Sequence, residues 1–248
     1  VTDMLALDDI TVAFQGFTVL DGLSLRVETG ELRFLIGPNG AGKTTLLDLL
    51  TGKVRPATGK AVYDGRIDIA KQQEHSLVKL GIGRKFQTPA IYPSLTCLEH
   101  LEVAIGFRRS LPVLFGTLRK GELERIEEAL ETVGLTHRAH TRASALSHGE
   151  QQWLEIAMLI VQDPKLLLLD EPVAGMTGQE REKTGELMHA LAGRHTIIVT
   201  EHDMEFVRRF SRRVTVLHSG KVLTEGTMDE VQNAPTVIEV YLGRAQGR

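Results

Sequence analysis

A glycine-rich segment near the start of the chain has the residue types and spacing that bind phosphate. It runs Gly37-Pro38-Asn39-Gly40-Ala41-Gly42-Lys43-Thr44, fits the pattern G-x-x-x-x-G-K-[ST] and is followed by Thr45. Its glycines allow backbone N–H groups to surround phosphate oxygens, and a helix that begins there adds its positive end. Lys43 would reach the β- and γ-phosphates of a nucleotide, and the Thr44 hydroxyl would help to hold Mg²⁺. The alternative is a simple glycine turn, but a chance match is expected in only roughly one such chain in a hundred.

Two adjacent acids follow an apolar run farther along the chain. Leu166–Leu169 leads directly to Asp170 and Glu171, and Pro172 then turns the chain. Ligands of open α/β sheets bind at the carboxyl ends of the strands, so acids placed there can act on a bound nucleotide. Asp170 would bind Mg²⁺, directly or through water, and Glu171 could polarise an attacking water as general base. A solvated acidic loop is the alternative, which the presence of the phosphate loop disfavours.

The segment Leu146-Ser147-His148-Gly149-Glu150-Gln151 can be interpreted in two ways. Ser147 and Glu150 have the spacing of a capping box, which any helix can use. A capped helix N-terminus with Gly149 bare is also a good anion site. The two interpretations are compatible. The order of the motifs favours the anion site, because this segment lies between the phosphate loop and the strand that ends in acids.

The apolar patterns of the sequence predict the strands and helices that would hold these residues in position. Alternating apolar residues from Leu5 to Val27 indicate short antiparallel strands. Continuous apolar runs indicate strands buried on both faces, and apolar residues three and four apart indicate helices. The predicted strands are Leu32–Ile36, Val62–Tyr63, Leu166–Leu169, Thr196–Thr200 and a hairpin of Val214–Leu217 with Lys221–Thr224. The predicted helices are Lys43–Thr51, Glu74–Leu80, Leu98–Ile105, Glu122–Val133, Glu150–Val161, Glu180–Leu191 and Met204–Phe210.

The order of these elements predicts an α/β fold. Strand–loop–helix order with buried strands implies a parallel sheet covered by helices. A block of helices interrupts that order, so we expect an inserted helical subdomain at 88–161 within a single domain spanning 1–248. Residues 1–87 and 162–248 would form the nucleotide-binding core, together with an N-terminal antiparallel β-subdomain. The inserted subdomain would carry the Ser147 segment.

Composition narrows the class of protein. The net charge is −3 without a long basic run, so binding to nucleic-acid phosphates is not favoured. The single cysteine, Cys97, excludes an intrachain disulfide and fits a reducing compartment. No apolar stretch approaches the ~20 residues that cross a bilayer, and no charged-then-apolar leader opens the chain. We therefore expect a cytoplasmic protein whose membrane role comes through a partner. Residues 106–121, which are basic and apolar, could face that partner or form an ordinary connecting loop.

The three motifs together resemble those of ATP-binding cassette (ABC) ATPases, which are P-loop NTPases with a RecA-like core. The resemblance covers nearly the whole chain. It implies that Phe14 stacks on adenine, that Gln87 links the two subdomains and senses Mg²⁺ and the attacking water, and that His202 contacts the γ-phosphate. It also implies that Ser147, Gly149 and Glu150 belong to a signature, Leu146–Gln151, which serves the ATP held by an opposite subunit.

Two departures from the ABC pattern stand out. The signature of the family usually reads Leu-Ser-Gly-Gly-Gln, whereas His148 and Glu150 interrupt that pattern here. Thr177 stands where most of the family has an aspartate, which puts in doubt the cross-subunit hydrogen bonds assigned to that aspartate. A threonine hydroxyl can still donate and accept.

Several stretches resemble a narrower branch of the family. Gly81–Gln87, Leu146–Leu159, Glu171–Thr177 and the tail Val237–Gly243 look like the ATPase subunits of branched-chain amino acid and amide importers, and are most similar to those of urea importers. The resemblance implies an ATPase that powers import of urea or short amides. Its partners would be a second ATPase subunit, in a homo- or heterodimer, membrane permease subunits at the inner face of the cell membrane, and indirectly a solute-binding protein. The alternatives are a branched-chain amino acid importer or another ABC system, an exporter or an iron–sulfur assembly ATPase.

Overall fold

The computed structural model describes residues 2–85, 91–106 and 119–242, with side chains described as far as residue 239. Gln87 and most of the 106–121 segment lie outside the described residues. Among the residues described, no helix combines the length and apolar character needed to cross a membrane.

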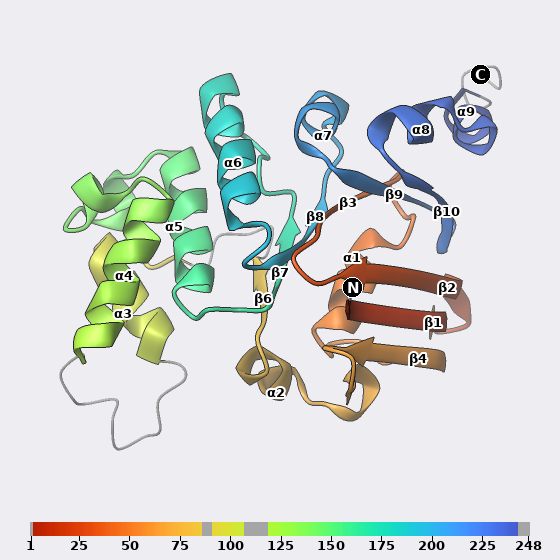
Figure 1. The fold of residues 1–248 in the computed structure, drawn as a ribbon, viewed down its shortest axis with the longest axis horizontal. Helices are drawn as coiled ribbons and strands as arrows, with labels where there is room; N and C mark the ends of the chain where they lie inside the picture. The colour runs from red at the N-terminus through yellow and green to blue at the C-terminus, as the bar shows by residue number, and fades with distance from the viewer. Residues whose placement is uncertain (1, 86–90, 107–118, 243–248) are drawn as a thin grey trace.

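A six-stranded sheet forms the centre of the molecule (Figure 1). Its strand order is β10-β9-β3-β8-β7-β6, and all neighbours pair in parallel except β10 with β9. The strands at its middle are mostly apolar and are buried along their whole length, as expected for a sheet covered on both faces. The strands are β3 (Leu32–Ile36), β6 (Ile82–Lys85), β7 (Leu166–Asp170), β8 (Thr196–Thr200), β9 (Arg213–His218) and β10 (Lys221–Gly226).

A second sheet of four antiparallel strands is built from the N-terminal part of the chain. Its order is β2-β1-β4-β5, and its long hairpin pairs β1 (Asp3–Phe14) with β2 (Phe17–Glu28). The shorter strands are β4 (Thr58–Tyr63) and β5 (Ile67–Asp68). Alternating residues of β1 and β2 are buried, which is the period of two that a half-covered sheet requires. This sheet is the predicted β-subdomain.

The two faces of the central sheet are covered by different elements. Alternate residues of one strand point to opposite faces. Leu167 and Leu169 therefore pack with the helical insertion, α6 and α7, whereas Leu166 and Leu168 pack with α1 and the antiparallel sheet. The helices are α1 (Lys43–Leu50), α2 (Glu74–Lys79), α3 (Cys97–Gly106), α4 (Lys120–Thr132), α5 (His148–Ile160), α6 (Gly178–Leu191), α7 (Met204–Phe210), α8 (Met228–Asn233) and α9 (Pro235–Leu242).

The helical insertion consists of α3, α4 and α5, which pack on one another at one end of the molecule (Figure 1). Cys97 is fully buried at the start of α3, and burial raises the pKa of its thiol. That environment fits a packing role for this cysteine, because reactivity requires an accessible thiolate.

The fold class predicted from the sequence is confirmed, and among the described residues the structure adds two strands, β5 and β6, and two helices, α8 and α9, to the prediction. The pattern Ile82-Gly83-Arg84-Lys85 is too short and too polar to indicate a strand, yet it pairs in parallel with β7. Helices α8 and α9 also lie outside the predicted set. The start of α8 carries a capping box, Thr227 with Glu230, so a sequence signal for that helix was present.

Candidate functional site

The phosphate loop connects the end of β3 to the start of α1. Gly42 is the N-cap of α1 and has φ 102°, a left-handed conformation that favours glycine. A side chain at Gly37 would collide with the carbonyl of Leu217 on β9. The loop is also fixed from outside, since Gly220 donates its N–H to Ala41 O at 3.1 Å. Neighbouring strands thus hold the loop in a shape that a chain with larger residues could not adopt.

Lys43 is folded back on this loop. Its Nζ donates to the carbonyl oxygens of Gly37 at 2.6 Å and Pro38 at 3.2 Å. Burial lowers the pKa of Lys43, and the nearby carboxylates of Glu171 and Asp170 oppose that shift. The ammonium group therefore lies between the loop and the two acids, where an added phosphate would give it a stronger anionic partner.

Asp170 is held at the carboxyl end of β7 by two neighbours. Thr200, its register partner on β8, donates from Oγ1 to Asp170 Oδ1 at 2.6 Å. Arg84 on β6 lies 3.4 Å from Asp170 Oδ2 and also donates to Asp48 of α1 at 2.5 Å. Arg84 thereby links α1, the helix that follows the phosphate loop, to the acid at the end of β7.

The donor set fits a magnesium ion bound together with a nucleotide. Mg²⁺ prefers hard oxygen ligands and is usually held by one or two carboxylates or hydroxyls plus substrate phosphates. Thr44 is an exposed residue in the first turn of α1, and the carboxylate of Asp170 is at the same edge of the sheet. The rest of the coordination would come from phosphate and water.

Glu171 and His202 form a pair beside this acid. Glu171 Oε1 lies 3.5 Å from His202 Nδ1, and the two side chains are 27% and 64% exposed. The backbone of Glu171 has φ 47°, an uncommon conformation for a residue other than glycine. Its N–H donates to Thr200 O at 3.1 Å, which fixes that conformation. A carboxylate and an imidazole, both reachable by water, can position and deprotonate an attacking water.

The signature begins helix α5 with a complete capping box. Ser147 Oγ accepts from Glu150 N at 3.1 Å, and Glu150 Oε2 accepts from Ser147 N at 2.8 Å. Glu150 Oε1 also pairs with Arg138 Nε at 3.2 Å. The capping interpretation is therefore confirmed, and it assigns the Glu150 carboxylate to the helix terminus in the free chain.

Both departures from the ABC pattern lie where the signature meets the loop after Glu171. His148 Nε2 lies 3.1 Å from Ala174 O. Thr177 caps α6 with Glu180, and Glu180 Oε1 in turn accepts from Ser147 Oγ at 3.1 Å. The signature and this loop are thus bound to each other within one chain.

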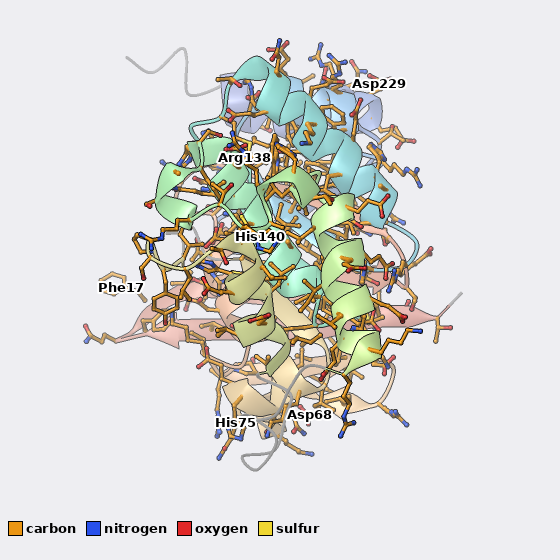
Figure 2. The ribbon with its side chains drawn as sticks, turned by 90° about the vertical axis from the view of Figure 1, so that its left-hand side faces the viewer. Phe17, Asp68, His75, Arg138, His140 and Asp229 are labelled. Carbon is orange, nitrogen blue, oxygen red and sulfur yellow. The ribbon has the colours of Figure 1, made fainter. Side chains whose placement is uncertain are left out.

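The structure brings some of the predicted residues together and keeps others apart. The phosphate loop, Asp170, Glu171 and His202 share the carboxyl edge of the parallel strands. Phe14 ends β1 at the hairpin tip and is 44% exposed; Phe17, on the other side of that tip, points away from the molecule (Figure 2). The α5 helix that carries Ser147, Gly149 and Glu150 packs on the opposite face of the sheet from α1. Gln87 lies outside the described residues.

Four residues contact the predicted site residues, or one another beside them, and were not identified from the sequence. They are Asp48, Arg84, Glu180 and Thr200. Arg84 could have been noticed as one of two charged residues in the segment that contains Gln87. The capping box of Thr177 and Glu180 is visible in the sequence, but its contact with Ser147 spans 33 residues and depends on packing.

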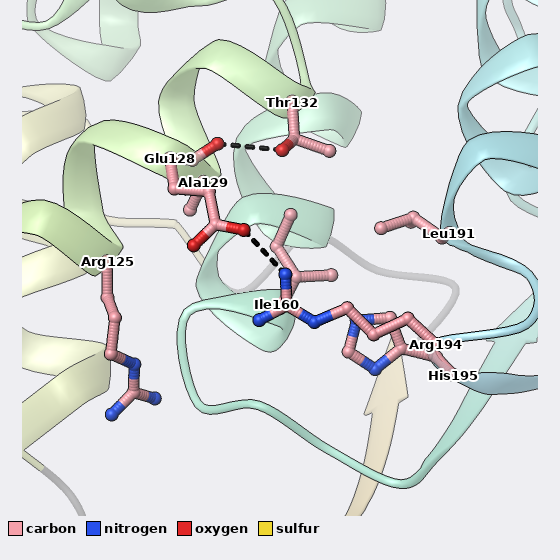
Figure 3. Close-up of a pocket in the computed structure, with 8 residues that line it drawn as sticks. All are labelled: Arg125, Glu128, Ala129, Thr132, Ile160, Leu191, Arg194 and His195. Atoms are coloured by element: carbon pink, nitrogen blue, oxygen red, sulfur yellow. Dashed lines mark hydrogen bonds and ion pairs between the residues drawn. The ribbon is translucent and has the colours of Figure 1, made fainter.

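A small pocket elsewhere on the chain is not a nucleotide site. It lies between α4 and the connection of α6 to β8 and has a volume of about 30 Å³ (Figure 3). Two of its charged groups are paired with each other, since Arg194 Nη1 donates to Glu128 Oε1 at 2.5 Å, and Arg125 donates to the carbonyl of Val161. Space of that size holds about one water molecule.

The parallel sheet, the phosphate loop at its edge and the acids on the neighbouring strands define an ATP-binding cassette of the P-loop class. The chain belongs to the ABC transporter family, whose model matches residues 20–174. Residues 221–246 match a second model, described as branched-chain amino acid ATP-binding cassette transporter. The chain is therefore an ABC ATPase that binds ATP.

Known proteins similar to the chain match it over nearly its full length. The high-affinity branched-chain amino acid transport ATP-binding protein BraF of Pseudomonas aeruginosa is 35% identical, with 98% of each chain covered. The crystal structure of an ATP-binding cassette of an ABC transporter in its ADP conformation superposes with a TM-score of 0.85 at 29% identity, covering 98% of this chain and 100% of the other. A dimeric cassette bound to ADP and Pi superposes with a TM-score of 0.75 at 27% identity, covering 91% and 99%.

Proposed function

We propose that this ABC ATPase powers the import of branched-chain amino acids through a membrane permease. The match of residues 221–246 to the branched-chain amino acid model carries this proposal, and the name of the BraF relative supports it. Urea was the solute first expected from the sequence. The matches to branched-chain amino acid transport proteins favour branched-chain amino acids over urea, so urea is the competing solute in the test.

The geometry supports specific roles for the residues at the carboxyl edge. The loop Gly37–Gly42 would surround the phosphates with N–H groups, and Lys43 would turn from the loop carbonyls to the β- and γ-phosphates. Thr44 and Asp170 would hold Mg²⁺, which when bound neutralises charge that develops on the phosphate oxygens. Glu171 would accept a proton from the attacking water, with His202 beside it at the γ-phosphate. By the resemblance to ABC ATPases, Thr45 would contact the nucleotide, Phe14 would stack on adenine, and Gln87 would sense Mg²⁺ and the attacking water.

A complete site would need a second subunit. In one chain the signature helix α5 and the phosphate-loop helix α1 lie on opposite faces of the sheet. Ser147, Gly149 and Glu150 would therefore serve the ATP of a partner, as in a dimeric arrangement like that of the similar ADP- and Pi-bound cassette. ATP held between two subunits binds the closed dimer better than the open one, and that differential affinity shifts the equilibrium.

The remaining partners follow from the import role. Permease subunits would hold the dimer at the inner face of the membrane and receive the motion of the helical insertion. A solute-binding protein would deliver the amino acid to the permease without touching this chain.

Reconstitution tests this proposal. The chain would be assembled in lipid vesicles with the permease and the solute-binding protein encoded beside it, and ATP hydrolysis measured with leucine, with urea and with neither. We expect leucine to stimulate hydrolysis severalfold and urea to leave it at the basal rate. The Glu171→Gln variant in the same vesicles is the control, and should bind ATP while losing about a hundredfold or more in turnover, since it lacks the general base.

Two results would contradict the proposal. Stimulation by urea and not by leucine would assign the amide importer instead. Turnover of the Glu171→Gln variant at the rate of the unmodified chain would contradict the role of Glu171.

A further inference from the structure

The carboxylate of Glu180 lies at the functional end of the signature. Its Oε1 accepts from Ser147 Oγ at 3.1 Å. A side chain at Gly149 would collide with the same carboxylate, so Glu180 also covers the bare backbone of Gly149. Ser147 and Gly149 are the two donors with which the signature would bind a phosphate. In the free chain, the Glu180 carboxylate occupies the position that this phosphate would take.

This contact is not required for the other task of Glu180. Its second oxygen, Oε2, accepts from Thr177 N and from Thr177 Oγ1, both at 2.9 Å, and this completes the capping box of α6. The chain offers a comparison at the start of α8. There Glu230 Oε2 accepts from Thr227 N at 2.7 Å and from Thr227 Oγ1 at 3.0 Å. One oxygen is thus sufficient for a cap, and Oε1 of Glu180 remains for the signature.

Glu180 is ionised while it makes this contact. Its pKa lies below the usual range for a glutamate, chiefly because the N–H of Thr177 stabilises the carboxylate, with further hydrogen bonds from Ser147 and from the Gly149 N–H. The hydroxyl of Ser147 has one proton to donate, so it cannot serve the carboxylate and a phosphate oxygen together. Two anions at these donors would also repel each other.

We propose that Glu180 is a built-in competitor for the γ-phosphate of the partner's ATP, and that its carboxylate must leave Ser147 and Gly149 before the ATP-bound dimer can close. The inference rests on the proposed function, because it assumes that the signature serves ATP in a second subunit. Glu180 raises the ATP concentration at which the dimer forms and keeps the signature from binding other phosphates in the free subunit.

ATP-dependent dimerisation of the full chain tests this. The Glu171→Gln variant is the parent, since it retains ATP, and its dimer fraction would be measured by sedimentation velocity across an ATP titration. Adding Glu180→Gln keeps the size of the side chain and a capping oxygen but removes the charge. We expect the ATP concentration for half-maximal dimerisation to fall about three- to tenfold, since a neutral hydrogen bond competes less well than a charged one.

Glu230→Gln in the same parent is the matched control, because it makes the same change in the capping box of α8. We expect its ATP midpoint to equal that of the parent. Binding of a fluorescent ATP analogue to dilute monomers should be the same for all three proteins, since the competitor lies away from the phosphate loop.

Glu180→Asp provides a second variant in case Glu180→Gln lowers stability. It keeps the charge and a cap but withdraws the carboxylate from Ser147 by one methylene, and it should also lower the midpoint. An unchanged or higher midpoint in both folded variants would overturn the competitor role alone. A parent that stays monomeric at saturating ATP would overturn both this inference and the proposed shared site.

Discussion

Glu201 is a buried carboxyl directly beneath the catalytic edge. It is 1% exposed, and its oxygens accept from Val173 N at 3.3 Å and His202 N at 3.2 Å. These contacts fix the positions of the loop after Glu171 and of His202. Burial nevertheless raises the pKa of Glu201 above its ordinary value of 4.5. The fold therefore makes ionisation of this carboxyl less favourable than it is in the unfolded chain.

That shift predicts how stability depends on pH. Between pH 4.5 and the raised pKa, the Glu201 carboxyl binds more protons in the folded chain than in the unfolded chain. Its contribution to the free energy of unfolding therefore falls as pH rises through this range. Glu201→Gln removes the charge and keeps an acceptor. We expect the melting temperature of the variant, relative to the unmodified chain, to be higher at pH 7.5 than at pH 4.5, by roughly a few degrees.

Calorimetry at several pH values measures this difference. Glu127→Gln, a change at an exposed position of α4, is the control for general effects of removing a carboxylate. A difference in melting temperature that stays constant across the pH range would contradict the argument.

At the scale of elements, helices α6 and α7 are in close contact at Gly185. A Cβ added at Gly185 of α6 would lie inside contact distance of the Phe210 ring on α7. That ring packs at a tilt against Phe206 with centroids 4.9 Å apart, and Phe206 lies at a tilt against Phe34 of β3 with centroids 6.1 Å apart. The aromatic row connects α6, which carries Glu180, to the strand that leads into the phosphate loop.

Gly185→Ala should therefore destabilise the chain by about 1–3 kcal/mol, the usual cost of overpacking a filled core. Gly178→Ala is the matched control in the same helix, because a Cβ there meets nothing within 4 Å. It should be neutral or stabilising by about 0.4–1 kcal/mol, since alanine has less freedom in the unfolded chain. Unfolding in guanidinium chloride measures both. Equal stability of the two variants would contradict the packing argument.

At the scale of the whole molecule, the phosphate-loop helix α1 and the signature helix α5 lie on opposite faces of the central sheet, so the proposed site would be shared by two subunits. Lys43→Ala damages the phosphate-loop half and Ser147→Arg damages the signature half, so each variant alone should be inactive. A mixed dimer would join the intact loop of one variant to the intact signature of the other. Mixing should therefore restore hydrolysis, up to about a quarter of the unmodified rate if dimers form at random and sites act independently.

The control mixes Lys43→Ala with Asp170→Asn. Both changes damage the same half, so the mixed dimer contains no intact site and should stay inactive. Steady-state hydrolysis at equal total protein measures both mixtures. Equal rates in the two mixtures would contradict a site shared between subunits.

Local patterns in the sequence were sufficient to predict much of this molecule. The phosphate loop, the acids after an apolar strand and the capping box of Ser147 each depend on residues close together in the chain, so spacing alone identifies them. Strands that are mostly apolar and do not alternate with polar residues indicated burial on both faces, and hence the parallel sheet. Strand β6 was missed because one apolar residue in four gives no period.

Only the tertiary structure decided what these motifs contact. Arg84 reaches Asp170 and Asp48 because β6 pairs with β7 at the edge of the sheet, a register that local sequence does not encode. The contact of Glu180 with Ser147 joins helices that meet only after the insertion has packed on the core. The sequence by itself determined which groups can bind phosphate, because that follows from residue types and short spacings. Packing between distant elements determined which of those groups are already occupied in the free chain.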